Sequence, residues 1–591
     1  TVTTYLPSGI YQIAITGMDM HNINSWRYSS GIVGVTSSDA PSQVPAATCV
    51  DPYGRRISNS SQSEMGMEIW PDGAIYMWGE NGYGQLGDGT TTYRTSPIRV
   101  LKGDYTGTSY FGDGCNGVIQ ASPGHCHSLA ILNDGSVYSW GHNDEGQLGI
   151  NSIVNASAPK RVLKGAYPGT TYIGDDSTNM IVSVFGGLEY SVAVSQKGQV
   201  YSWGDNIVRQ LGDSSTTDRL TPVRVLKGNY PGTRYLGDDP TNPILQVSGG
   251  NAFSIALAAD GTIYAWGTNA AGQLGDNSTT ARWVPVRVLK GTYSGTTYLG
   301  DNASNKVVQI AAADSTGYAL TADGTVWSWG LNNEGQLGSG ATGTNRSTPA
   351  RVIKGAYPGI TNMGDSTTNK ITSIHAGGGH ALAVSTRGLV YSWGRNDYGQ
   401  IGDNTTTDRN TPVRVLKGAY TGTTYLGDGA ITMDKIGTGR HHSHALGNGN
   451  NKTYSWGYGL EGRLGHGAET NSSIPVLVNQ GARPLAKASQ EIIPASTNAT
   501  PTDVVVISGL GIYPDVNQVY MTLDAIEPMD ITIDIYSTAG VHLARPVDRQ
   551  KFTNGKQRFG INIPSELLTG SYLLKAWSDK GSTARTFILS R

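Results

Sequence analysis

Short runs in which apolar and polar residues alternate, separated by signals for tight turns, fill most of this 591-residue sequence. A typical run reads Ser128-Leu-Ala-Ile-Leu-Asn-Asp-Gly-Ser-Val-Tyr-Ser-Trp140, with two apolar segments around a central Asp134-Gly135. Alternation with a period of two predicts half-buried β-strands, and Asp-Gly favours a two-residue hairpin because both residues tolerate positive φ angles. The pattern therefore predicts a chain of β-hairpins.

The hairpins recur at a nearly constant period. A Trp-Gly pair closes each copy, with spacings of 62 to 64 residues, at Trp78, Trp140, Trp203, Trp266, Trp329, Trp393 and Trp456. The motif G-x-N-x-x-G-Q-L-G follows, clearest at Gly141–Gly149, Gly267–Gly275 and Gly330–Gly338. Regular recurrence at this length is the signature of a repeat architecture built from one supersecondary unit.

A hairpin that ends in Trp-Gly and is followed by N-x-x-G-Q-L-G resembles the regulator-of-chromosome-condensation repeat family, over residues 57–478. The resemblance implies an all-β, seven-bladed β-propeller with four-stranded blades around a central channel. Residues 1–56 read as a partial copy, and we expect part of this segment to close the ring by pairing near Ile474–Val478. A ring of eight blades, the first degenerate, is the alternative.

Six copies carry an insert of the form P-x-R-V-L-K-G-x-Y-x-G-T-x-Y-x-G-D, and the seventh copy lacks it. Equivalent positions place six lysines and six tyrosines on a partial ring, which is a candidate surface for a partner. Its members are Lys102, Lys164, Lys227, Lys290, Lys354, Lys417, Tyr105, Tyr167, Tyr230, Tyr293, Tyr357 and Tyr420. The alternative, favoured because the copies barely vary, is that these residues tie each insert to its own blade.

A polar stretch at residues 479–502 reads as a linker, and residues 503–591 contain six or seven short apolar segments typical of an immunoglobulin-like β-sandwich. Their pattern resembles the C-terminal sorting domain of type IX secretion substrates. The matching residues are Gly540, Gly570, Tyr572 and Lys575. The resemblance implies export to the exterior of a bacterial outer membrane, although the usual Y-P-N-P opening reads Tyr513-Pro514-Asp515-Val516 here. A retained sandwich used for adhesion or assembly is the alternative.

Charge and composition exclude several classes of protein. The 43 basic and 45 acidic residues give a net charge of −2, so no overall field attracts nucleic acid or an anionic membrane. No apolar run is long enough to span a bilayer. The first residue is Thr1, as expected of an exported protein after removal of its signal, although a trimmed chain would begin in the same way.

The sequence offers little catalytic or metal-binding chemistry. No nucleophile elbow, zinc-protease or phosphate-loop motif is present. His442 and His444 alternate on one strand face, but the first of them occupies a slot of the repeat itself. Cys115 and Cys126 are expected either as one disulfide or as two buried thiols. We expect no cofactor; calcium is the alternative for the L-G-D turns at Asp175, Asp238, Asp301 and Asp365.

These observations together predict a non-catalytic, secreted or cell-surface binding or structural protein that uses a propeller as its interaction scaffold. The expected partners are a surface protein or glycan, other copies of the same chain, and secretion machinery at the C-terminal domain. Inhibition of a secreted enzyme is an alternative. Guanine-nucleotide exchange, by analogy with the repeat family, is a further alternative that we do not prefer.

Overall fold

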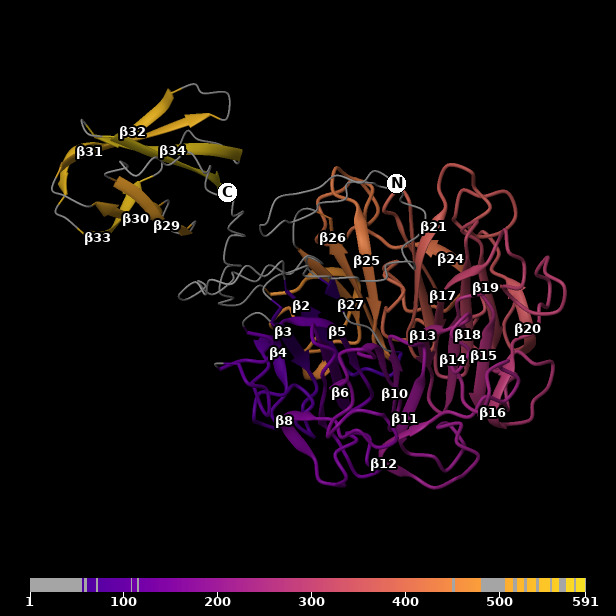
Figure 1. Ribbon diagram of the computed structural model, residues 1–591. Coiled ribbons are helices and arrows are strands. Elements are labelled where there is room, and N and C mark those ends of the chain that lie inside the picture. The colour runs from indigo at the N-terminus through magenta and orange to yellow at the C-terminus, as the bar shows by residue number, and fades with distance from the viewer. Residues whose placement is uncertain are drawn as a thin grey trace, which may run out of the picture. The chain divides into compact units, whose positions relative to one another are not determined.

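The computed structural model describes residues 56–57, 61–70, 73–107, 109–113, 116–448 and 452–479, together with the strands of a C-terminal unit. The chain divides into two compact units, residues 1–482 and 483–591. Within the first unit, the strands form seven antiparallel four-stranded sheets (Figure 1).

Each sheet, or blade, uses four strands that are consecutive in the chain. The first three blades comprise β1 (Arg56–Ile57), β2 (Met65–Ile69), β3 (Ile75–Gly79) and β4 (Arg94–Arg99); β5 (Val118–Pro123), β6 (His127–Leu132), β7 (Val137–Gly141) and β8 (Ala156–Arg161); and β9 (Ile181–Gly186), β10 (Tyr190–Ser195), β11 (Val200–Gly204) and β12 (Arg219–Arg224). The fourth and fifth comprise β13 (Ile244–Gly249), β14 (Phe253–Ala258), β15 (Ile263–Gly267) and β16 (Arg282–Arg287); and β17 (Val307–Ala312), β18 (Thr316–Thr321), β19 (Val326–Gly330) and β20 (Arg346–Arg351). The last two comprise β21 (Ile371–Ala376), β22 (His380–Ser385), β23 (Val390–Gly394) and β24 (Arg409–Arg414); and β25 (Met433–Thr438), β26 (His442–Gly447), β27 (Thr453–Gly457) and β28 (Ser472–Leu477). One short 3₁₀ turn, η1 (Leu460–Gly462), lies between β27 and β28.

The two middle strands of a blade carry its core. Every residue of β14 is buried, whereas the outermost strand β12 has one buried residue among partly exposed ones. The predicted hairpin turn joins the middle strands, and Gly135 has the positive φ of 82° that the turn requires. Because both faces of a middle strand pack against neighbouring blades, its apolar residues run continuously instead of alternating.

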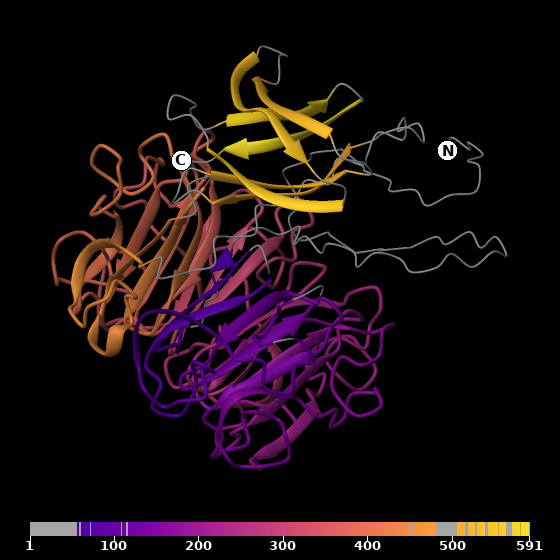
Figure 2. The same cartoon turned by 90° about the vertical axis from the view of Figure 1, so that its left-hand side faces the viewer.

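The repeated tryptophans join each blade to the one before it. The indole Nε1 of Trp140 donates a 2.9 Å hydrogen bond to the carbonyl of Gln85 in the preceding blade, and the later copies repeat this contact. Trp78 completes the series by donating to the carbonyl of Arg463, 385 residues further along the chain. In Figures 1 and 2, the indigo first blade lies beside the orange last blade. The ring therefore closes with seven blades, and the eight-bladed alternative is wrong.

The N-terminal end of the described chain completes the first blade. Strand β1 pairs with β2, and the last blade obtains all four of its strands from its own repeat. Near Ile474–Val478, β28 pairs with β27, and the expected pairing of the N-terminal segment there stays a prediction. Residues 1–55, which include the predicted partial copy, lie outside the described residues.

The C-terminal unit is also built from antiparallel strands. One sheet has the order β29 (Val505–Tyr513), β30 (Gln518–Ala525), β33 (Gly555–Asn562); the other has the order β32 (His542–Phe552), β31 (Met529–Ser537), β34 (Gly570–Ser578), β35 (Gly581–Leu589). Gly570, Tyr572 and Lys575 belong to β34, whereas Gly540 and most of the expected linker lie outside the described residues. The immunoglobulin-like and sorting-domain assignments stay predictions.

Candidate functional site

The propeller has two chemically different faces. In an antiparallel sheet of consecutive strands, successive connections lie at opposite ends. One face therefore carries the Asp-Gly hairpins and the six inserts, and we call it the insert face. The other face carries the connections from first to second strands and from third to fourth strands.

The tyrosines of the candidate ring do not form an exposed surface. All six rings are buried, with at most 5% of each residue exposed. Their hydroxyls donate to backbone carbonyls at the end of the same insert; for example, Tyr230 bonds to Asn242 at 2.6 Å and Tyr167 to Asn179 at 2.7 Å. Tyr293, Tyr357 and Tyr420 make equivalent contacts, and Tyr105 donates to the carbonyls of Asp113 and Asn116. These contacts support the internal role that the near-identity of the copies favoured.

The lysines and aspartates of the inserts are also engaged locally. The ammonium groups of Lys164, Lys227, Lys290 and Lys417 donate to a glycine carbonyl five residues ahead, and Lys102 and Lys354 are exposed. Asp175 accepts hydrogen bonds from the backbone amides of Thr171 and Tyr172. Burial raises the pKa of Asp175, but the bond from the Thr170 hydroxyl and these amide bonds outweigh it and lower the pKa to about 2. Partner binding by the lysines, and calcium at these turns, stay predictions.

The inserts connect neighbouring blades. The backbone amide that follows each Lys-Gly pair donates to a proline carbonyl in the outermost strand of the next blade, as Ala166 does to Pro222 at 2.7 Å. The equivalent donors are Asp104, Asn229, Thr292, Ala356 and Ala419. Because the seventh copy lacks the insert, this link is not made from the seventh blade to the first among the described residues. The insert face is thus a repetitive scaffold.

Residues on the opposite face differ from copy to copy. We define the rim as five positions of each repeat: the two residues before each second strand, and the first, third and fourth residues after each Trp-Gly. Of these 35 residues, ten are Asp or Glu and two are Arg, whereas the whole chain has a net charge of −2. The rim positions are therefore acidic on balance, and they vary between copies.

An ion-pair cluster occupies the rim where the last blade meets the first. The Arg463 guanidinium lies 3.0 Å from Glu64 and 3.4 Å from Glu80, and Arg440 lies 3.8 Å from Glu64. Burial raises the pKa of Glu64, and Arg463 opposes that rise. Arg463 stands where the other six copies have the Gln of G-Q-L-G.

A second cluster joins the second and third blades. His142 Nδ1 lies 3.0 Å from one carboxylate oxygen of Glu189, and His125 Nδ1 lies 3.6 Å from the other. Burial raises the pKa of Glu189, but bonds to both histidines lower it to about 2; the bond to Glu189 in turn raises the pKa of His142. Both imidazoles already have a carboxylate partner, so the cluster stabilises the rim.

The cysteine beside this cluster is not an activated nucleophile. Cys126 Sγ lies 3.5 Å from His125 Nδ1, and burial, reinforced by nearby carboxylates, raises the pKa of the thiol. Cys115 lies outside the described residues, so the expected disulfide is not tested. In the part of the chain that the structure describes, no three or more His, Cys, Asp or Glu side chains form a metal-binding group. His442 and His444 are both buried in the repeat's core.

Aromatic pairs cross the junctions between rim loops. The rings of Tyr398 and Tyr458 lie 4.5 Å apart, and Tyr83 packs on His142 at 4.2 Å. Leu460, two residues after Tyr458, is 46% exposed, and Ile207 in the third blade is 71% exposed. Tyrosine is among the residues enriched at the energetically important positions of protein interfaces.

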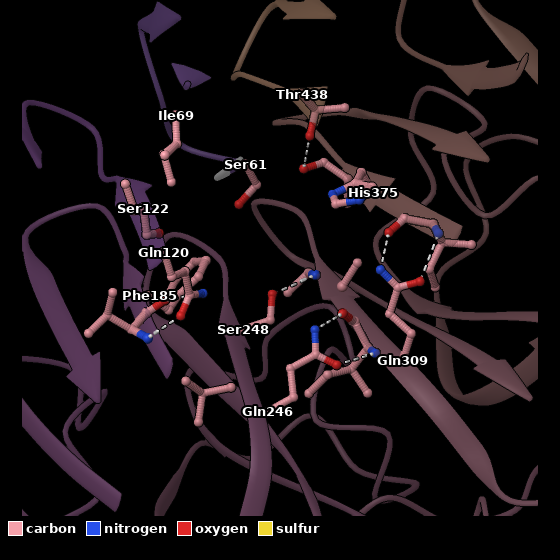
Figure 3. A pocket seen from close by; sticks show the side chains of 18 of the residues that line it. Ser61, Ile69, Gln120, Ser122, Phe185, Gln246, Ser248, Gln309, His375 and Thr438 are labelled. Carbon is pink, nitrogen blue, oxygen red and sulfur yellow. Dashed lines mark hydrogen bonds between the residues drawn. The ribbon is translucent and has the colours of Figure 1, made fainter. Parts of the chain in front are cut away.

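The central channel is narrow, and its polar groups are mostly used to join blades. The cavity in it has a volume of about 200 Å³ (Figure 3). Gln246 both donates to the carbonyl and accepts from the amide of Ile310 in the next blade, and Gln309 does the same with Ile374. His375, which also lines the cavity, has its pKa lowered by burial to about 4. The channel residues therefore hold the ring together.

Sequence reasoning singled out the repeated residues and missed the rim. The sequence does contain a signal for the rim, because the rim positions vary between otherwise similar copies. The described part of the chain also holds no helix with the length and hydropathy needed to cross a membrane.

Comparisons with known proteins agree with this architecture. The chain is 29% identical over 353 residues to the ultraviolet-B receptor UVR8 of Arabidopsis thaliana, a match covering 59% of this chain and 66% of the receptor. It is 28% identical over 366 residues to human E3 ubiquitin-protein ligase HERC2, covering 61% of this chain and 6% of the ligase. The chain thus spans less than two thirds of either relative.

Solved structures share the fold. The yeast protein Prp20p from Saccharomyces cerevisiae superposes with a TM-score of 0.53 at 23% identity, over 72% of this chain and 88% of that one. Human WBSCR16 superposes with a TM-score of 0.54 at 21% identity, over 69% and 94%. A sequence model of one family, described as the RCC1-like domain, matches residues 34–361 and 227–500. With seven Trp-Gly blades in a closed ring, this chain belongs to the RCC1-like domain family.

Proposed function

We propose that this protein is a non-catalytic interaction scaffold whose rim binds one partner protein. The observation that carries the proposal is the contrast between faces: the inserts are nearly identical and internally bonded, whereas the rim differs in every blade. A ring of identical sites suits a repetitive partner, while a ring of different side chains suits one irregular surface. Binding by RCC1-like relatives, such as that of Prp20p to Gsp1p and histones, is consistent with such a role.

The charge of the rim favours a partner with a basic surface. The rim has eight more carboxylates than arginines; Arg463 pairs with two of them, Glu64 and Glu80, and the others steer such a partner toward this face. Tyr398, Tyr458 and the exposed Leu460 supply an aromatic and aliphatic centre, with the carboxylate of Asp397 half exposed beside them. This combination of a partly apolar centre and a charged surround is typical of protein interfaces.

Charge reversal on each face tests the proposal. We expect the double variant Asp144→Lys, Asp397→Lys to lose the native partner in affinity capture from the source cells, and the wild-type complex to weaken as salt rises. The matched control, Asp104→Lys with Asp434→Lys, makes the same change of charge away from the rim and should retain the partner. Loss in the control alone, or equal retention by both variants, would contradict a rim interface.

We also propose a secreted or cell-surface location, and only the C-terminal unit supports it. Its support is the resemblance of Gly540, Gly570, Tyr572 and Lys575 to a type IX sorting signal. Residues 503–591, placed behind a signal peptide and a reporter, should bring the reporter to the surface of a host with type IX machinery. A reporter that stays in the periplasm would favour a purely structural unit.

Two alternative functions, enzyme inhibition and nucleotide exchange, predict different results. Inhibition of a secreted enzyme would use the same rim, and the captured partner would then be an enzyme that loses activity in the complex. One relative, 26% identical over 412 residues, is the secretion-regulating guanine nucleotide exchange factor of Bos taurus. No contact on the rim of this chain favours nucleotide exchange over simple binding.

A further inference from the structure

Three residues before the second strand of the first blade reach other blades. Ser61, Gln62 and Ser63 are at most 1% exposed, and we call them the cross-channel segment. Seven residues separate Ile57, which pairs with Glu68, from β2, whereas five separate the equivalent Ala121, which pairs with Ala130, from β6. The first blade therefore has additional chain at the mouth of the channel.

The cross-channel segment bonds to the far side of the ring. Ser61 Oγ donates a 3.2 Å hydrogen bond to the carbonyl of Gly249 in the fourth blade. Gln62 Nε2 donates a 2.8 Å bond to the Asp314 carboxylate in the fifth blade. The fourth and fifth blades are the two farthest from the first in a seven-membered ring, so these bonds cross the channel. Ser61 is seen at the wall of the cavity in Figure 3.

The same segment also supports the junction with the last blade. The amide of Arg440 donates a 2.8 Å hydrogen bond to the carbonyl of Ser63. Asp314 and Arg440 are both rim residues, so the segment fixes parts of the rim on opposite sides of the channel. At this junction the link from an insert to a proline carbonyl is missing among the described residues, and Arg463 replaces the repeated Gln.

We propose that the cross-channel segment, Ser61–Ser63, locks the closed ring by tying the first blade to the fourth and fifth blades across the channel. It compensates for the hydrogen bond from an insert to a proline carbonyl that the described residues do not make between the seventh and first blades. The proposal does not depend on the partner, because it concerns the ring itself.

Hydrogen–deuterium exchange of the full chain tests this lock. We expect Gln62→Ala to speed exchange at least tenfold in β2, β26 and β28, with smaller changes in the third blade. The matched control is Gln246→Ala, which removes a channel-facing glutamine that bonds only to its neighbouring blade and should loosen β13 and β17 locally. Equal loosening of all blades by Gln62→Ala, or no change at the junction, would overturn the proposal.

Further variants keep the test decisive if Gln62→Ala does not fold. Ser61→Ala removes a single bond and should produce the same pattern with a smaller amplitude. Asp314→Asn keeps an oxygen that accepts the Gln62 amide and should preserve the junction, whereas Asp314→Ala should loosen it. If Asp314→Asn and Asp314→Ala behave alike, the contact does not act as a lock.

Discussion

The Arg463 guanidinium Nε lies 3.0 Å from Oε2 of Glu64, and both side chains are 8% exposed. This ion pair joins the last blade to the first at the one junction where the repeat lacks its Gln. The carbonyl of Arg463 also accepts the indole N–H of Trp78, so one residue takes part in closure through both its backbone and its side chain.

Changing Arg463 to Gln, the residue of the other copies, should lower the free energy of unfolding by about 3 kcal/mol. The bond from Trp78 can persist, but the Glu64 carboxylate is left buried without its main cation. Urea unfolding followed by tryptophan fluorescence measures the change. The double variant with Glu64→Gln should recover most of the loss, and failure to recover would show that charge is not the cause.

Changing Trp266 to Phe should cost about 1–3 kcal/mol, because the buried carbonyl of Gln210 loses the 2.8 Å bond from the indole and keeps only the 3.4 Å bond from Ser254 Oγ. Calorimetry of the full chain measures the shift in melting temperature. Trp283, which is 42% exposed, is the control. Equal shifts for Trp266→Phe and Trp283→Phe would argue against the role of the indole bond between blades.

Changing Tyr230, Tyr293 and Tyr357 together to Ala should destabilise the propeller before it affects any binding by folded molecules. Each buried ring leaves a cavity, at a cost of about 3–5 kcal/mol per site. The triple change to Phe keeps the rings and removes only the hydroxyl bonds, so it should cost much less. An intact fold with lost self-association or glycan retention would instead support a binding ring.

Stability should fall as the pH drops below about 6.5, in part because of His380. Burial lowers the pKa of this histidine to about 3, and its Nε2 lies 2.8 Å from Ser443 Oγ. The unfolded chain takes up a proton near pH 6.5, whereas the folded chain resists it, so the stabilisation present above pH 6.5 is lost progressively toward pH 3. At pH 5 the loss is about 2 kcal/mol.

His380→Phe tests this pH dependence, since Phe253 fills the same slot in the fourth blade. The variant should be less sensitive to pH between 7 and 5 than the wild type, measured by the midpoint of urea unfolding. Parallel curves for the two proteins would assign the acid sensitivity to other groups.

The fold could be predicted because its determinants are local and repeated. Trp-Gly and the Asp-Gly turns specify the blades, and the period specifies their number. Ring closure is harder to predict from the sequence, because it depends on contacts that occur only once in the ring. These are Arg463 with Glu64, and Gln62 with Asp314. The repeat pattern gives no reason to single out a residue that departs from it, such as Arg463, as part of the junction.

For the candidate site, recurrence in the sequence indicates residues that have an internal role. Tyr230 and its equivalents were noticed because they recur, and recurrence here reflects internal bonding. Asp144 and Tyr398 each recur in only one other copy, as Asp397 and Tyr83, and Leu460 in none, so the repeat pattern does not single them out. Their proximity on one face follows only from the alternation of connections in the folded sheets.

Each insert contacts the blade that follows it in the chain, and this order affects how the protein folds during synthesis. Each insert bonds to a proline carbonyl in the blade that is synthesised next, so a blade acquires its full set of bonds only after the ribosome has made its successor. Assembly should therefore proceed in step with translation from the first blade onward. The contact between Glu64 and Arg463 has to wait until some 400 residues separate its partners, and such long-range contacts form slowly. We expect a nascent chain released before residue 463 to carry well-formed early blades with exposed edges, which makes it a substrate for chaperones.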